Sequence, residues 1–153
     1  IFHAETINTP SMLATADCLD ALAWVESIGG LKSTIARSQE SLRVITDWVA
    51  ASDWIGFLAA TPEMRSATSV CLKITDPWLL SQPDDARLAF VKEMLKPLDK
   101  EKAGYDLASY RTAPAGIRIW CGATVETSDV TALLPWLDWA YATAKAARQQ
   151  AGA

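Results

Sequence analysis

Apolar residues recur every three or four positions in four stretches of the chain, the spacing of a helix that packs one face on a core. The first stretch follows Asn8-Thr9-Pro10-Ser11, where Thr9 is a good N-cap and Pro10 suits the first helical position. Gly29-Gly30 ends it. The predicted core positions are Met12, Ala16, Leu19 and Ala23; Ile35, Leu42, Ile45 and Val49; Leu88, Val91, Leu95 and Leu98; and Val130, Leu133, Leu137 and Tyr141.

The third and fourth helices carry further signals at their ends. Asp84 and Asp85 lie where the third helix starts and favour the positive end of its dipole. Thr127 or Ser128 is expected to cap the last helix, and Pro135 should kink or split it. The Ala- and Gln-rich end from Ala146 is expected to fray.

Short apolar or alternating segments between these helices predict strands. They lie at Trp54–Ala59, Ser69–Ile74 and Ile117–Cys121. Strands interleaved with helices in this way predict an α+β fold, a small, mostly antiparallel sheet with helices packed on it. Since no internal repeat or linker divides the sequence, residues 1–153 are expected to form a single domain.

Composition and charge narrow the classes of function. The chain has 153 residues, of which 50% are hydrophobic and 21% charged, with a net charge of -4. The basic residues are scattered singly, which argues against a nucleic-acid or anionic-membrane surface. The cysteines Cys18, Cys71 and Cys121 are far apart, as in a reduced, cytoplasmic chain. The start at Ile1, without Met, is expected to be a cut inside a longer protein.

Few residues offer chemistry of their own. His3 is the only histidine in the sequence, so neither a Ser-His-Asp triad nor a His/Cys metal cluster can be assembled. Asn8 and Thr9 precede a predicted helix N-terminus, where backbone N–H groups and side-chain donors can bind an anion. The alternative is that Thr9 only caps the helix.

Two arginines are candidate ligands for anionic substrates. Arg118 lies within the apolar strand Ile117–Trp120, where a guanidinium needs an anion or a cleft. It could instead pair with a local acid or face water. Arg111 lies in the loop that starts at Gly104, and a solvated surface charge is the simpler interpretation there. The polar turn Met64–Val70 is interpreted as structural.

Four segments, taken in order, resemble a known family. They are TINTPSM at the start, IGGLK between the first two helices, MRSATSVCLKI, and YRTAPAGIRIWCGATVE. Each is similar to the corresponding segment of phosphoserine aminotransferases, and the set runs from about Thr6 to Ala144. The resemblance implies the small C-terminal domain of a class V, fold-type I enzyme that depends on pyridoxal phosphate (PLP). The large PLP-binding domain would lie outside this chain.

The resemblance also implies roles for particular residues. Such enzymes are cytoplasmic homodimers of serine biosynthesis that transfer an amino group between glutamate and 3-phosphohydroxypyruvate, giving O-phosphoserine and 2-oxoglutarate. Asn8 and Thr9 would contact the PLP phosphate of the neighbouring subunit. Arg118 would hold the substrate α-carboxylate and Arg111 the substrate phosphate. Many members have His where this chain has Tyr110, which weakens the phosphate assignment.

The resemblance places no catalytic residue in this chain. The family's Schiff-base lysine belongs to the large domain, and no lysine here matches its context; Lys145 and the other helical lysines are interpreted as solvated charges. The fragment alone is therefore expected to be inactive and not to retain PLP. The alternatives are another class V aminotransferase, of the serine or alanine–glyoxylate type, and a non-catalytic α+β binding module.

Overall fold

The computed structural model describes residues 8–110 and 112–151. For Ala151 it describes the backbone alone. His3 and Arg111 therefore lie outside the described residues. The chain divides into two compact units, residues 1–36 and 37–153. Each unit is described by itself.

The first unit holds α1 (Met12–Ser27) and the start of α2 (Gly30–Ala51). The N-cap of α1 is Ser11, whose hydroxyl oxygen accepts a hydrogen bond from the Ala14 amide at 3.3 Å. The predicted cap at Thr9 and helix start at Pro10 are therefore wrong by two residues. Both Ser and Thr can cap, and Ser11 is the one spaced to satisfy a first-turn amide.

Gly29 and Gly30 separate the first two helices, as predicted. Gly29 has φ +105° and Gly30 φ +73°, in the region that favours glycine. A Cβ added to Gly29 would also lie 2.5 Å from the Ser33 hydroxyl oxygen. The break is therefore fixed by backbone conformation and by the first turn of α2.

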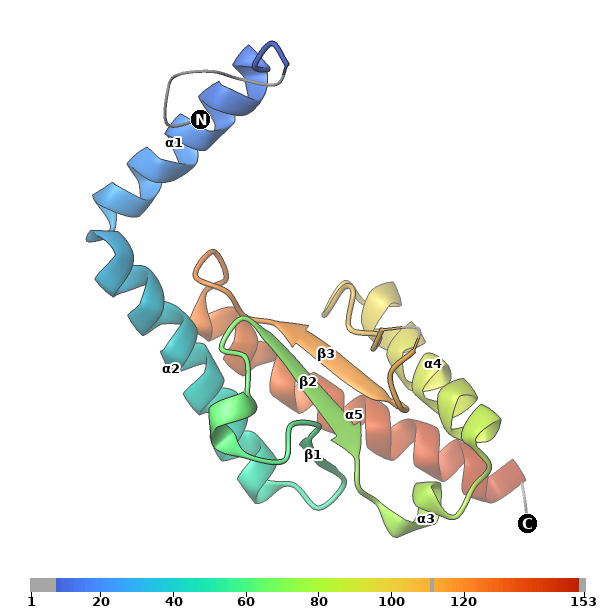
Figure 1. The fold of residues 1–153 in the computed structure, drawn as a ribbon. Coiled ribbons are helices and arrows are strands. Elements are labelled where there is room, and N and C mark those ends of the chain that lie inside the picture. Colours follow the sequence, from blue (N-terminus) through green and yellow to red (C-terminus); the bar gives the residue numbers. More distant parts are fainter. Residues whose placement is uncertain (1–7, 111, 152–153) are drawn as a thin grey trace. The chain divides into compact units, whose positions relative to one another are not determined.

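The second unit is built on a three-stranded antiparallel sheet in the order β1-β2-β3 (Figure 1). The first residue of β3, Gly116, lies close to β2, and a Cβ there would lie only 2.0 Å from the Leu72 carbonyl oxygen. This position therefore requires glycine. Cys71 pairs with Arg118, which places these two side chains on the same face. The strands are β1 (Ile55–Phe57), β2 (Ser69–Ile74) and β3 (Gly116–Trp120), close to the predicted segments.

Helices cover one face of this sheet. Figure 1 shows α5 running along the sheet behind β2 and β3, with α4 beside it. On β2 the side chains of Val70, Leu72 and Ile74 are buried, whereas the alternate positions are half-buried or exposed. The helices of this unit besides α2 are α3 (Pro77–Leu80), α4 (Asp84–Lys100) and α5 (Thr127–Ala151), with a short 3-10 helix η1 (Pro62–Met64). The predicted α+β fold is confirmed.

Several details of the helix predictions are wrong. α5 is one helix from Thr127 to Ala151. Of the two outcomes predicted at Pro135, a kink or a split, the split is therefore wrong. Leu134 and Leu137, before and after the proline, are buried. Their packing compensates for the backbone hydrogen bond that proline cannot donate. The described helix continues past Ala146, and Arg148 donates two hydrogen bonds of 2.8 Å to Glu93 of α4.

Six predicted core residues are exposed. They include all four of the positions predicted on α1, which are Met12, Ala16, Leu19 and Ala23. Ile35 on α2 is 45% exposed and Leu88 on α4 is 39% exposed. Leu133 on α5 is only partly buried, and its neighbour Leu134 is 5% exposed. On α2, α4 and α5 helical spacing identified the buried side approximately, whereas on α1 no residue is buried. The width of each buried stripe depends on the neighbouring elements.

Aromatic residues and two acids join the helices to the sheet edge. The indole N–H groups of Trp48 and Trp54 both donate to the Asp138 carboxylate, at 2.9 and 2.8 Å. Trp54 stacks on Tyr141 with ring centroids 4.2 Å apart. The Tyr141 hydroxyl in turn donates to Asp76. A buried chain of polar contacts therefore runs from α2 through α5 to the N-terminus of α3.

Asp76 is the charged centre of this network. It caps α3 by accepting from the Trp78 amide at 2.8 Å, and it forms an ion pair with Lys145. Burial favours a raised pKa for Asp76, but the hydrogen bonds from Lys145, Tyr141 and the Trp78 amide outweigh it and lower the pKa. Lys145 is thus a partner in a partly buried ion pair, which corrects its interpretation as a solvated charge.

Candidate functional site

Arg118 lies on the sheet face opposite the buried side chains of β2, and its side chain is 16% exposed. Its Nη2 forms an ion pair with Asp106, and its Nη1 donates to the Tyr110 hydroxyl at 3.3 Å. The guanidinium carbon lies 4.8 Å from the centre of the Tyr110 ring. The loop before β3 therefore supplies both partners of this arginine.

The backbone fixes that loop against β3. The Arg118 amide donates to the Leu107 carbonyl at 2.9 Å, and Ala108 forms an isolated bridge with Ile117. Asp106 sits in the turn with φ +52°, a conformation that aspartate tolerates better than most residues. The loop thus positions the Asp106 carboxylate and the Tyr110 ring on Arg118.

Arg118 is held in its charged form, and one of its N–H groups has no hydrogen-bond partner among the described residues. Burial favours a lower pKa, but Asp106 and Tyr110 outweigh it and raise the pKa. The Nε of Arg118 is buried and has no hydrogen-bond partner among the described residues. A guanidinium with a free buried N–H can donate to a further anionic oxygen.

Asp106 was not singled out from the sequence, although it is the acid that pairs with Arg118. Its side chain is 82% exposed, so water and salt weaken the pair. The structure therefore pairs the strand arginine with a local acid. This was one of the two alternatives to ligand binding, the other being that Arg118 faces water. A ligand carboxylate could replace this exposed acid, because it offers the guanidinium the same pair of oxygens.

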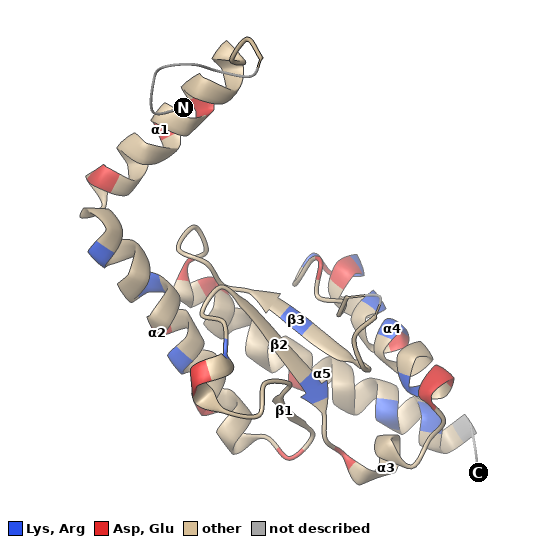
Figure 2. Cartoon of the chain, viewed as in Figure 1, with Lys and Arg blue, Asp and Glu red and all other residues tan. Residues whose placement is uncertain are grey.

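A groove lies beside Tyr110. It has a volume of about 530 Å³ and runs between α4 and residues 108–110. Lys92 and Lys96 of α4 line it together with Tyr110, and its lining also includes Val91 and Leu95. Figure 2 shows that Lys and Arg are otherwise mixed with Asp and Glu along the helices. Asp99 also lines the groove, so an anionic ligand there would meet two lysines and one acid.

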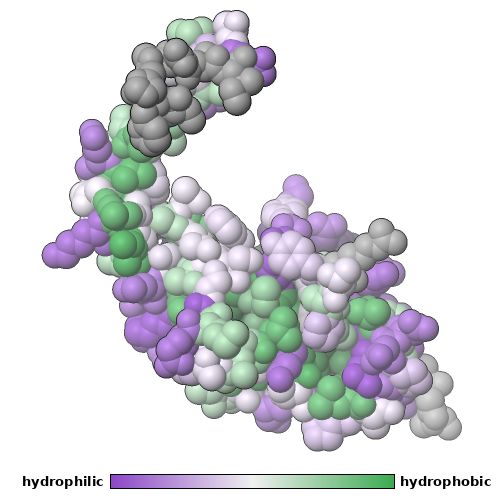
Figure 3. Space-filling model, in the orientation of Figure 1, coloured by the Kyte–Doolittle hydropathy of each residue, from purple (hydrophilic) through white to green (hydrophobic). Residues whose placement is uncertain are grey.

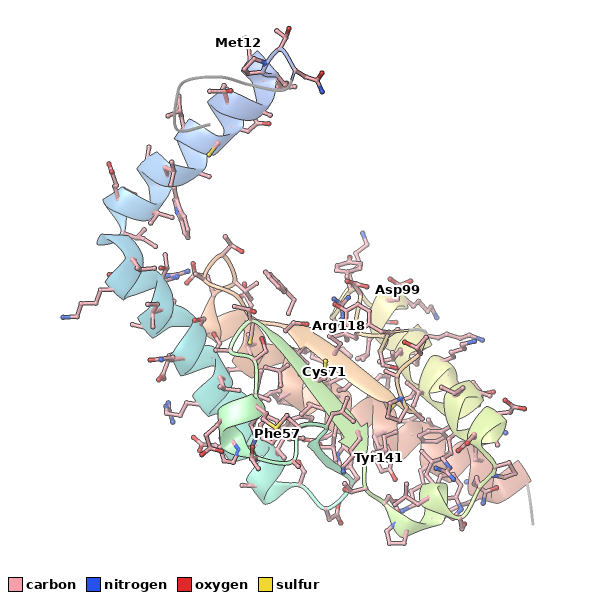
Figure 4. All side chains as sticks on the ribbon, viewed as in Figure 1. Met12, Phe57, Cys71, Asp99, Arg118 and Tyr141 are labelled. Carbon is pink, nitrogen blue, oxygen red and sulfur yellow. The ribbon has the colours of Figure 1, made fainter. Side chains whose placement is uncertain are left out.

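The remaining predicted site residues lie elsewhere. Asn8 and Thr9 precede α1 in the first unit and are exposed. Their donors are therefore accessible, but Ser11 performs the capping. Arg111, the predicted phosphate ligand, lies outside the described residues. Figure 4 shows Arg118 on β3 and Cys71 on β2, the adjacent strand.

The described residues offer neither a metal cluster nor a membrane span. Within residues 8–110 and 112–151, no group of three or more His, Cys, Asp or Glu side chains is arranged to hold a metal ion. None of the helices in the described part is both long and apolar enough to cross a membrane.

The fold is shared with a segment of aminotransferase structures. A phosphoserine aminotransferase from Bacillus circulans subsp. alkalophilus superposes with a TM-score of 0.71 at 18% identity, over 89% of this chain and 34% of that one. A phosphoserine aminotransferase studied for radiation damage of its Schiff base gives 0.67 at 20% identity, over 89% and 35%. No family model matches the chain.

Sequence relatives match the chain at higher identity than these solved structures do. The chain is 52% identical over 141 residues to a phosphoserine aminotransferase of Methanosarcina barkeri, covering 92% of this chain and 35% of the relative. It is 50% identical to the phosphoserine aminotransferase of Methanosarcina mazei over the same shares. The predicted resemblance to phosphoserine aminotransferases is thus confirmed, and the chain spans about a third of the length of these relatives.

Proposed function

We propose that the chain contributes the substrate-binding side of a phosphoserine aminotransferase, which transfers an amino group between glutamate and 3-phosphohydroxypyruvate. The observation that carries the proposal is Arg118, a largely buried arginine with an unpartnered Nε and only an exposed acid as ion-pair partner. It stands in a chain that is similar to members of this family over nearly its whole length.

In this proposal Arg118 holds the α-carboxylate of the substrate. The substrate displaces Asp106 and engages the guanidinium edge, while the Tyr110 ring keeps the guanidinium in place. A fixed carboxylate orients the Cα atom, at which amino transfer takes place. Arg111 is proposed to bind the phosphate, and Lys92 and Lys96 of the adjacent groove add positive charge.

PLP is the cofactor that this proposal requires. When bound, it supplies the electron sink for the reaction. Asn8 and Thr9 fit its phosphate by chemistry, because an exposed amide and hydroxyl ahead of a helix can donate to anionic oxygens. The proposed enzyme is a cytoplasmic homodimer in which these residues serve the neighbouring subunit, and the chain alone is inactive.

A chimera tests the proposal. This chain replaces the matching segment of the Methanosarcina barkeri enzyme, with which it is 52% identical. The chimera should catalyse transfer from glutamate to 3-phosphohydroxypyruvate. A folded, PLP-loaded chimera that is inactive with this pair of substrates would refute the assignment.

Variants of the chimera test the role of Arg118. Arg118→Gln should lower kcat/KM by about 100-fold, mainly through KM, because a charged hydrogen-bonded pair with the substrate is lost. Asp106→Asn should instead lower KM by about threefold, since it removes a competing carboxylate from an exposed pair. Arg43→Gln is the control, because Arg43 pairs with Glu40 and Asp47 on the exposed side of α2. Equal losses in all three variants would contradict the role.

Arg111 distinguishes the phosphate substrate from the glyoxylate-type alternative. Arg111→Gln should weaken binding of 3-phosphohydroxypyruvate but leave that of plain 2-oxo acids unchanged. An equal effect on both substrates would argue against a phosphate contact.

A further inference from the structure

Arg65 lies between η1 and β2, is half-buried, and forms no ion pair with the residues that the structure describes. Its Nε is buried, and within the part of the chain that the structure describes the side chain makes no hydrogen bond. The guanidinium carbon lies 3.8 Å from the centre of the Phe57 ring. The ring thus holds one face of the cation and leaves its N–H edges unused.

A second unused donor lies on the same cavity. The Ser69 hydroxyl is buried and has no described partner. The neighbouring Ser66 differs, because its hydroxyl oxygen accepts from the amides of Thr68 and Ser69 at 3.2 and 3.0 Å. Ser66 therefore stabilises the turn, whereas the hydroxyl of Ser69 is not engaged by it.

Arg65 and Ser69 line a cavity of about 250 Å³ at the β1–β2 connection. Its lining also includes the apolar residues Leu58 and Met64. Figure 3 shows that hydrophobic surface reaches this face of the molecule over the strands, and Figure 4 places Phe57 on β1 near Cys71 on β2. The cavity thus combines one cation, the unpaired Ser69 hydroxyl and apolar lining residues.

Buried donors are nearly always paired in native proteins, so two orphans on one cavity need an explanation. An ordered water could accept from either donor, but it would not neutralise the charge of this half-buried guanidinium. A carboxylate satisfies both, because its two oxygens match the edge of a guanidinium and can also accept from a hydroxyl. The apolar lining residues suit a short hydrocarbon tail on the same molecule.

We infer that the cavity between Arg65 and Ser69 binds the carboxylate of a small organic acid. This site differs from that of Arg118 in its contacting groups, because the partners of Arg118 come from the loop before β3 and not from the β1–β2 connection. The two sites share a sheet face, since Cys71 lines the cavity and pairs with Arg118. The cavity site is also independent of the proposed transaminase activity, since its occupancy is a binding event within this chain.

A titration of the 153-residue chain with propionate tests the inference, with the Arg65 side-chain Nε–H signal and the Ser69 amide followed by NMR at constant ionic strength. Both signals should shift and saturate together. Sodium chloride and inorganic phosphate serve as comparison anions. No saturable shift, or an equal shift with chloride, would mean that the site holds only water or a diffuse ion atmosphere, and would overturn the inference. Tighter binding of phosphate than of propionate would overturn the carboxylate assignment.

Variants locate the binding. Ser69→Ala should weaken propionate binding by about tenfold, because a charge-assisted hydrogen bond is lost while the Arg65 charge remains. Arg65→Lys keeps the charge but removes the Nε donor and should weaken binding similarly. For both variants the backbone amides at positions 69 and 70 report binding. Arg43→Gln is the matched control and should bind as the original chain does. Unchanged binding in both site variants would refute the site.

Discussion

The helices α1 and α5 are both rich in apolar residues, but they use them differently. None of the α1 residues is buried, and Met12, Leu13, Leu19 and Leu22 are 54% to 78% exposed. On α5 the side chains of Val130, Leu134, Leu137, Ala140 and Tyr141 are at most 5% exposed.

The difference teaches that apolar content does not by itself place a helix in a core. The large apolar residues of α1 include the adjacent pair Met12 and Leu13, which point in different directions around a helix. A helix that is apolar on many sides is normally buried in a larger structure. Burial of α1 is therefore expected in an enzyme of the length of the relatives, which are about three times as long as this match.

The largest expected effect on the free energy of unfolding comes from a substitution on α5, the buried helix of the two. Leu137→Ala on α5 removes a side chain that is 0% exposed and should lower the free energy of unfolding by about 3 kcal/mol. Leu19→Ala on α1 should change it by less than about 0.5 kcal/mol, because its side chain is already 62% exposed. Urea unfolding followed by circular dichroism measures both. Similar losses of stability in the two variants would contradict the distinction between a buried α5 and an exposed α1.

A somewhat smaller loss of stability is expected when the polar contacts of α5 are removed. Asp138→Ala leaves the indole N–H groups of Trp48 and Trp54 without their acceptor and should cost about 2 kcal/mol. Asp47→Ala, at an exposed ion pair on α2, is the control and should cost less than about 0.5 kcal/mol. The same unfolding experiment separates them, and equal costs would show that the indole contacts contribute little.

The ion pair between Asp76 and Lys145 of α5 makes part of the stability dependent on pH. Because the pKa of Asp76 is lowered on folding, its contribution is complete above the unfolded value near 4 and is lost as the pH falls through the folded value. Asp76→Asn should therefore cost about 1 kcal/mol at pH 7 and progressively less below pH of about 4. Unfolding curves of both proteins between pH 7 and pH 3 test this. A difference that stays constant on acidification would contradict it.

The smallest effect on stability is expected on α1. The double variant Leu13→Gln and Leu19→Gln should leave the free energy of unfolding within about 0.5 kcal/mol of the original. It should, however, reduce self-association, because it removes exposed apolar surface. Light scattering at increasing concentration measures this, with Leu80→Gln on α3 as the control. A chain that is already monomeric at high concentration would contradict the expectation.

The fold could be predicted from the sequence to a large extent. The alternation of Ser69–Ile74 identified β2 with its bounds, since a half-buried strand repeats every second residue. The helix start at Ser11 was missed because Thr9 and Ser11 are both good caps, and only the backbone geometry selects between them. The sequence left open whether Pro135 would kink or split α5, because the packing on both sides that keeps the helix continuous depends on tertiary contacts.

The candidate site could be predicted only in part. Arg118 was recognised because a charge in an apolar strand needs a partner. Its partner Asp106 was not, because the acid lies twelve residues earlier and a turn brings it back. Arg65 and Ser69 were interpreted as part of a structural turn, and only the described atoms reveal two buried donors without partners.

The sequence by itself determined the α+β class, the strand segments, the glycine break between the first two helices and the likeness to phosphoserine aminotransferases. These follow from local periodicity, from the conformational freedom of glycine and from ordered motifs along the chain. The tertiary structure alone decided which apolar residues are buried, which acid neutralises Arg118 and which donors stay unpaired. Those properties depend on contacts between residues distant in sequence, which local spacing does not specify.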